Sequence, residues 1–183
     1  WKLIKATDYL EFSRSGNRGI LEGPVAANRK ALFTLMVAEL AEGRGRFIDQ
    51  IINGVFLFCE MTTWSPPAHL YIQKVRSPFP DHSEDIIDIS GAETAAVLAW
   101  AYYFFHVEFD KHNKLISKRL YGELERRILN NYIKDVGWWW LAENYKPGML
   151  VNNWNPWCNS NVLLCYMLLD GDKDRFAKAV YKS

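Results

Sequence analysis

The chain reads AETAAVLAWAYYFFHVE from Ala92 to Glu108, and this stretch decides the fold class. No charged residue, proline or glycine occurs between Ala95 and Phe105. The run is too long for a typical strand and too short for the roughly 20 apolar residues that cross a bilayer. It therefore predicts a helix that is buried on nearly all sides.

The next stretch has a different pattern, because residues 113–132 are strongly amphipathic. Leu120 and Leu124 lie on one side of the expected helix, opposite Lys114 and Lys118. Helices that are apolar on all sides alternate with helices that are apolar on one side only. This alternation indicates two concentric layers, as in an (α/α) toroid. A plain helical bundle or a solenoid is the alternative, although no sequence repeat of fixed period is visible.

We expect one all-α domain over residues 1–183, an incomplete (α/α) toroid with too few helices to close. No region alternates with period two, so strands should be few or absent. A loop rich in proline is expected over residues 62–90. The expected helices cover residues 24–42, 46–60, 92–108, 113–132 and 161–169, with a short one that Asp172 caps.

Composition restricts the classes of function. The net charge of +1 gives no broad basic field, which argues against a nucleic-acid partner and leaves an acidic ligand to be held by a few placed groups. No apolar run is long enough to span a membrane. The three cysteines lack the spacing of metal ligands, and Cys59 and Cys165 lie in apolar runs, so we predict no metal or cofactor.

The most unusual segment reads VNNWNPWCNSN from Val151 to Asn161. Its five amides cannot all be buried without partners, and Pro156 disfavours helix at the preceding residue, which predicts a turn that leads into a helix. The amides could simply cap that turn. The functional alternative is a carbohydrate subsite, in which amides contact sugar hydroxyls and indoles stack on sugar rings. Its candidate residues are Asn152, Asn153, Trp154, Asn155 and Trp157.

A second cluster of candidates lies after the helix that ends near residue 60. Trp64 and His69 belong to the expected loop, and His69 is the best titratable candidate for proton transfer or charge pairing. Glu93 lies in the first turn of the apolar helix, where it either satisfies the helix terminus or projects into a cleft. The acidic residues between Asp81 and Asp88 fit a solvated loop that approaches a helix start.

Five short motifs occur along the chain in this order: Gly16-Asn17-Arg18, Gly45-Arg46-Phe47, Trp64-x-x-Pro67-Ala68-His69, Ala92-Glu93-Thr94-Ala95 and Asn152-Asn153-Trp154-Asn155. Taken together, they resemble the heparinase II/III-like proteins. The resemblance spans most of the chain and implies an incomplete (α/α) toroid, which full-length members follow with a β-sandwich domain that this sequence lacks. The chain begins at Trp1 and ends within a helical pattern, so we expect a piece of a longer protein.

The resemblance implies β-elimination on a uronic-acid polymer such as heparan sulfate or alginate, by an exported protein, periplasmic or secreted. Related lyases carry an Asn-Asn-His element that contacts the substrate carboxylate. Asn153 matches its second Asn, while Trp154 stands in the His place. The catalytic Tyr and a second His usually lie further along, beyond Ser183. The chain should therefore bind substrate but be inactive alone. An (α/α) glycoside hydrolase and a non-catalytic carbohydrate-binding or structural helical domain are the alternatives.

Overall fold

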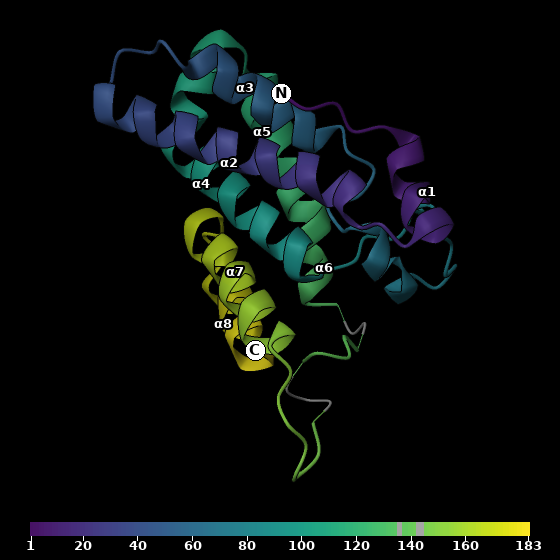
Figure 1. The fold of residues 1–183 in the computed structure, drawn as a ribbon. Coiled ribbons are helices and arrows are strands. Elements are labelled where there is room, and N and C mark those ends of the chain that lie inside the picture. Colours follow the sequence, from purple (N-terminus) through teal and green to yellow (C-terminus); the bar gives the residue numbers. More distant parts are fainter. Residues whose placement is uncertain (135–136, 142–144) are drawn as a thin grey trace.

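The computed structural model describes residues 1–134, 137–141 and 145–183, and these form helices and loops without a strand (Figure 1). The all-α expectation is therefore confirmed for the described residues. None of their helices is long and apolar enough to cross a membrane. The elements are α1 (Ala6–Ser15), α2 (Gly19–Glu42), α3 (Ile48–Cys59), the 3-10 helix η1 (Pro67–Ile72), α4 (Ile89–His112), α5 (Lys114–Leu124), the π-helix η2 (Glu125–Leu129), α6 (Asn130–Tyr132), α7 (Trp154–Leu169) and α8 (Lys173–Lys182).

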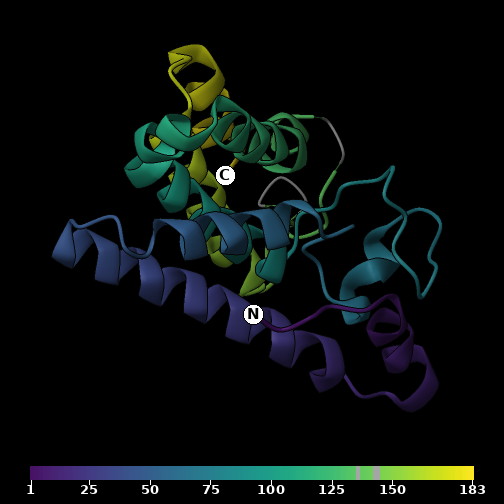
Figure 2. The same ribbon diagram turned by 90° about the horizontal axis from the view of Figure 1, so that it is seen from above.

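Helix α4 is the centre of the packing, because it contacts α2, α3, α5 and α7. Seen from above, α2 and α3 lie side by side along one edge of the molecule (Figure 2). Ala95, Leu98 and Ala99 are fully buried, as the apolar pattern of α4 predicts. The first half of α4 is thus the inner helix that the sequence indicates.

The second half of α4 departs from that prediction, because three large side chains are about half exposed. Three apolar residues of α2, its neighbour, are exposed to a similar degree. Elements among the described residues bury only one side of this part of α4. The exposed residues are Tyr103, Phe104 and Val107 on α4, and Phe33, Val37 and Leu40 on α2.

Helix α2 begins five residues earlier than the sequence indicated. We expected Pro24 in its first turn, whereas the helix starts at Gly19 and includes Pro24. The side chain of Asn17 accepts a hydrogen bond from the Gly19 N–H (2.9 Å), and Arg18 forms an ion pair with Glu22 (2.7 Å). The Asn17 contact satisfies an N–H of the first turn, and the helix continues through Pro24. Helix α1, in the region read as mixed, was not predicted.

The amphipathic stretch 113–132 is helical as expected, with Leu120 and Leu124 fully buried. Asn113 caps it by accepting the Leu115 N–H (2.9 Å). The pattern did not predict that α5 passes through the π-helical turn η2 before α6. Such turns re-aim side chains and often occur near functional sites.

The long loop between α3 and α4 is ordered by a buried glutamine. The Gln73 side-chain amide donates to the carbonyls of Asp81 (2.8 Å) and Glu84 (2.7 Å), and its oxygen accepts the Asp81 N–H (3.0 Å). Gln73 is fully buried, so one side chain replaces the backbone pairing that a strand would provide. The loop therefore holds its ends, which carry the site residues, in fixed positions.

Helix α7 corrects the expectation of a turn at Asn155. The helix starts at Trp154, and Pro156 lies in its first turn, where the missing N–H needs no helical partner. The Asn152 side chain accepts the Trp154 N–H (3.0 Å) and so helps to start the helix. The predicted cap of α8 is confirmed, because Asp172 accepts the N–H groups of Asp174 (2.9 Å) and Arg175 (3.1 Å).

Candidate functional site

A cavity of about 380 Å³ lies between the start of α2, the loop before α4, the first turn of α4 and the start of α7. Five of the eight residues singled out from the sequence line it, although they come from three separate stretches of chain. Side chains of α2 that sequence reasoning did not single out form the opposite wall. The five predicted residues are Trp64, His69, Glu93, Asn153 and Trp157, and the polar side chains of α2 are Arg18, Glu22 and Arg29.

His69 is held in this cavity by a buried carboxylate. Its Nδ1 contacts the Asp88 carboxylate, whose side chain is fully buried, while the His69 side chain keeps 12% of its surface exposed. The other oxygen of Asp88 accepts the Gly91 N–H (2.6 Å) and the Ser65 hydroxyl (2.9 Å). Asp88 thus caps α4 and fixes the imidazole at the same time.

Sequence reasoning missed Asp88, because it grouped this residue with the solvated acidic loop. An aspartate that immediately precedes a long apolar helix is a typical N-cap, and this signal was available in the sequence. Asp85, from the same stretch, pairs with Arg126 instead. The acidic stretch therefore contains residues of a surface loop and one buried carboxylate, Asp88, which contacts His69.

The two guanidinium groups of the cavity are each paired with a glutamate. Arg29 contacts Glu93 (2.7 Å) and donates to the Thr94 hydroxyl (3.1 Å), which joins α2 to α4. Arg18 contacts Glu22 (2.7 Å) within α2. Glu93 is thus directed to the cavity rather than to the end of its own helix. The cavity carries both signs of charge, with donors and acceptors on the same wall.

Asn153 and Trp157 supply the exposed part of the cavity. The exposed side-chain amide of Asn153 makes no hydrogen bond with any residue that the structure describes. Trp157 lies one turn later and is 48% exposed. An amide with free donors beside an exposed indole is an arrangement suited to a sugar ring.

The other predicted residues of the Asn-rich segment support the fold instead of lining the cavity. The Asn155 amide donates to the Trp140 carbonyl (3.0 Å), and Asn152 caps α7. Trp154 is buried, with its ring 4.6 Å from the ring of His69 and 5.1 Å from that of Trp139. The structural alternative of capping and packing therefore describes these three residues.

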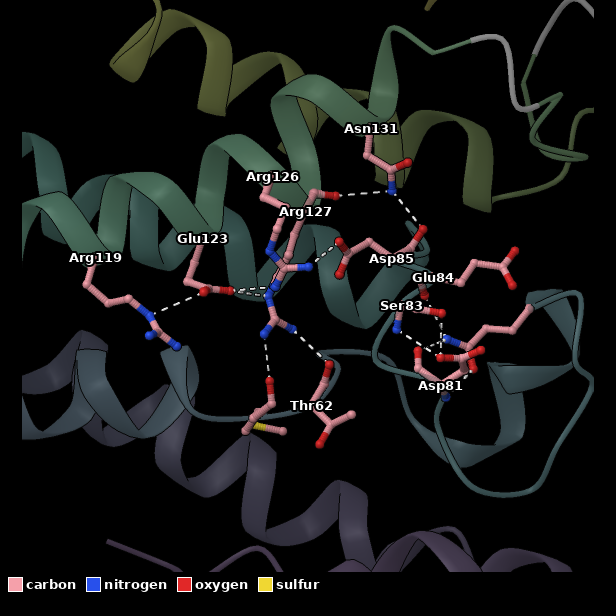
Figure 3. A network of polar contacts seen from close by, with 12 residues as sticks. Thr62, Asp81, Ser83, Glu84, Asp85, Arg119, Glu123, Arg126, Arg127 and Asn131 are labelled. Carbon is pink, nitrogen blue, oxygen red and sulfur yellow. Dashed lines mark hydrogen bonds and ion pairs between the residues drawn. The ribbon is translucent and has the colours of Figure 1, made fainter.

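A charged network around Arg127 contacts the Trp64 ring. Figure 3 shows Arg127 between Glu123 and Thr62. The buried Arg127 guanidinium lies over the Trp64 ring (4.8 Å to its centroid) and donates to the carbonyls of Met61 (2.6 Å) and Thr62 (3.3 Å). It also pairs with Glu123 (2.7 Å). Burial by itself would raise the pKa of Glu123, but the hydrogen bonds from Arg127 and Arg126 hold that pKa below its ordinary value.

The cysteines are not part of this site. Burial raises the pKa of Cys59 and of Cys165 to about 12 and also raises the pKa of Cys158, so all three remain protonated thiols at neutral pH. Within the described parts of the chain, no group of three His, Cys, Asp or Glu side chains could hold a metal ion.

Comparisons with protein-family models and with curated proteins find no match to this chain.

Proposed function

We propose that the chain is the helical part of a polysaccharide lyase, an incomplete (α/α) toroid whose cavity binds a uronic-acid polysaccharide for β-elimination. One observation carries this proposal. The fold brings an exposed indole, a free amide, two guanidinium groups and an anchored imidazole to one cavity, from stretches up to 139 residues apart, Arg18 to Trp157.

The chemistry of these groups matches that of a uronate residue. The face of Trp157 can stack on the apolar face of a pyranose ring, while the amide of Asn153 can donate to its carboxylate. Arg18 and Arg29 add positive charge, and their glutamate partners can accept hydrogen bonds from sugar hydroxyls. A volume of about 380 Å³ lies within the range of small-molecule sites.

The motif resemblance supports the same proposal. Trp154 stands where related lyases carry a histidine, and the His69 ring lies 4.6 Å from the Trp154 ring. A different segment therefore supplies an imidazole next to Trp154. The exposed apolar residues of α2 and α4, which include Phe33 and Phe104, give a surface that further helices of a toroid would cover.

Two alternatives make different demands on the cavity. A glycoside hydrolase needs one protonated and one ionised carboxyl group. Glu22 and Glu93 both line the cavity, but each contacts a guanidinium at 2.7 Å, so neither is an unpaired carboxyl group. A non-catalytic binding domain would use the same cavity without turnover. The two enzyme classes also differ in their products, since only elimination gives an unsaturated uronate that absorbs ultraviolet light.

The test of the proposal is binding. The chain is titrated with heparan sulfate, chondroitin, hyaluronan and alginate oligosaccharides, and with neutral cello-oligosaccharides as the control, while tryptophan fluorescence and heat release are recorded. We expect an acidic oligosaccharide to bind, and Trp157→Ala to weaken its binding by on the order of 10-fold or more through the lost stacking. Tyr181→Ala, at an exposed ring outside the cavity, should bind as the parent does. Equal binding of neutral and acidic oligosaccharides, or no binding at all, would contradict the proposal.

A further inference from the structure

A carboxylate is rarely buried completely, and Asp88 holds three separate parts of the site from such a position. Its side chain has no exposed surface, yet it receives hydrogen bonds from Gly91 on α4 and from Ser65 in the loop, and it contacts Nδ1 of His69. Capping α4 requires only the first of these contacts. The contacts with Ser65 and with Nδ1 of His69 fix the carboxylate against the imidazole ring.

These contacts indicate which ring nitrogen of His69 carries the proton. An ionised carboxylate only accepts hydrogen bonds, so Nδ1 carries the proton that faces Asp88. The other ring nitrogen, Nε2, lies 3.5 Å from a guanidinium nitrogen of Arg18, and a guanidinium only donates. Nε2 therefore directs its lone pair toward Arg18 at the cavity wall, and it can accept a proton once Arg18 contacts a bound carboxylate instead.

We propose that His69 is a base that removes the proton from the carbon next to the substrate carboxylate, and that Asp88 is the residue that positions it. This inference rests on the proposed function, because the carbon acid is that of a bound uronate. It departs from our sequence expectation that the proton-transfer groups lie beyond Ser183.

The step balances within substrate and protein. Nε2 of His69 takes the C5 proton, and the electron pair of the C5–H bond forms the C4–C5 double bond. The C4–O bond breaks, and its electron pair leaves with the glycosidic oxygen, which takes up a proton from the imidazolium or from solvent. One linkage gives one unsaturated uronate and one alcohol, and no oxidant, reductant or water is consumed.

The charged groups around His69 favour this step. Arg18 lies beside Nε2, and Arg29 lines the same cavity from α2, so both can stabilise the negative charge that develops on the substrate carboxylate. Glu22 and Glu93 face the same cavity but are paired with these arginines. Asp88, behind the ring, stabilises the imidazolium that forms.

One substitution separates the positioning role of Asp88 from its role as a cap. In Asp88→Asn the side-chain oxygen can still accept from Gly91 and Ser65, and asparagine caps helices as well as aspartate does. The amide nitrogen then replaces the oxygen that faces His69, and it donates where the carboxylate accepted. The imidazole proton should move from Nδ1 to Nε2, which removes the lone pair from the nitrogen that faces Arg18.

The experiment measures proton removal without requiring complete cleavage. The chain is incubated in D₂O with hyaluronan and alginate oligosaccharides, and deuterium at C5 and unsaturated uronate are followed by mass spectrometry and ultraviolet absorbance. We expect exchange or elimination with the parent protein, a loss of roughly 10²–10⁴-fold in His69→Gln, and a loss in the same range in Asp88→Asn. His82→Gln, at an exposed histidine of the loop, is the control and should keep the parent rate.

Nitrogen-15 NMR of the His69 ring reads the tautomer directly, and circular dichroism confirms that each variant is folded. We expect Nδ1–H in the parent and Nε2–H in Asp88→Asn. Bound oligosaccharide without exchange in the parent, or exchange that survives His69→Gln, would overturn the assignment of the base and leave the binding proposal standing. Absence of binding would overturn both.

Discussion

Replacing Arg127 with alanine removes the guanidinium that joins η2 to the end of α3 and to the Trp64 ring. Four partners lose a contact: the carboxylate of Glu123, the ring of Trp64, and the carbonyls of Met61 and Thr62. Arg127 is almost completely buried, so water cannot readily replace these contacts.

The expected cost follows from these contacts. The carbonyls of Met61 and Thr62 are left without this donor at about 1–3 kcal/mol each, so the total should be about 2–6 kcal/mol, because Glu123 keeps Arg126 (2.7 Å) and Arg119 (3.2 Å) as partners. For a chain of this length, about 2–4 °C of Tm accompanies each kcal/mol, so the Tm should fall by roughly 4–24 °C. Arg126 provides a matched control, because it contacts the same Glu123 oxygen (2.7 Å) from a side chain that is 46% exposed. Arg126→Ala should cost only about 0–1 kcal/mol.

The assay is urea unfolding of the parent and both variants, followed by circular dichroism and by tryptophan fluorescence. Fluorescence should also change in folded Arg127→Ala, because the Trp64 ring loses its cation. Equal losses of stability in the two variants would refute the reasoning, since it depends on burial and not on charge. An Arg127→Ala protein within about 1 kcal/mol of the parent would refute it as well.

Three further predictions concern the site, a helix cap and acid stability. In the full-length protein, Asn153→Ala should lower turnover, measured as release of unsaturated uronate, by on the order of 10²–10³-fold. Asn161→Ala is the control and should have little effect. Unchanged release by Asn153→Ala would contradict the role of this amide. Asp172→Ala should lower the free energy of unfolding by about 1 kcal/mol in urea titrations, and Asp174→Ala by less, because only Asp172 caps α8. The folded pKa of Glu123 lies below its ordinary value near 4.5, so the stability that this carboxylate contributes is present above that value and is lost as the pH falls through the folded pKa. Urea midpoints measured between about pH 6 and about pH 3 should fall less steeply in Glu123→Gln, and identical slopes would contradict the assignment.

The sequence indicated the helices most reliably where apolar residues recur over several turns. The fully buried residues of α4 and the buried face of α5 follow directly from hydropathy and helical spacing. The exposed end of α4 could not be predicted, because hydropathy reports that a residue is apolar and not whether another element reaches it. The predicted helix starts were wrong at Gly19 and Trp154, where one asparagine side chain in each case accepts an N–H of the first turn.

The site was predictable in its residue types but not in its partners. Asn153, Trp157 and His69 stand out because amides, indoles and imidazoles are unusual in loops that lead into helices. Arg18 and Arg29 belong to the long helix α2, where an arginine is ordinarily a solvated residue, and only the packing of α2 against α4 brings them to the cavity. Among the amides of the Asn-rich segment, the sequence could not distinguish the exposed one from those that the fold uses.

The π-helical turn over Glu125–Leu129 has a consequence for the evolution of this chain. A π turn holds one residue more than the α-helical turn it replaces, so the residues after it are rotated by about 100° from the α-helical phase. Asn131 and Tyr132 use that rotated phase to reach the Asp85 carbonyl (2.8 Å) and the Asn159 side chain (2.8 Å). Deletion of a single residue from the turn would restore a regular helix and withdraw both side chains at once. The length of this segment is therefore constrained more tightly than its composition, and relatives of this chain should tolerate substitutions here sooner than a change of one residue in length.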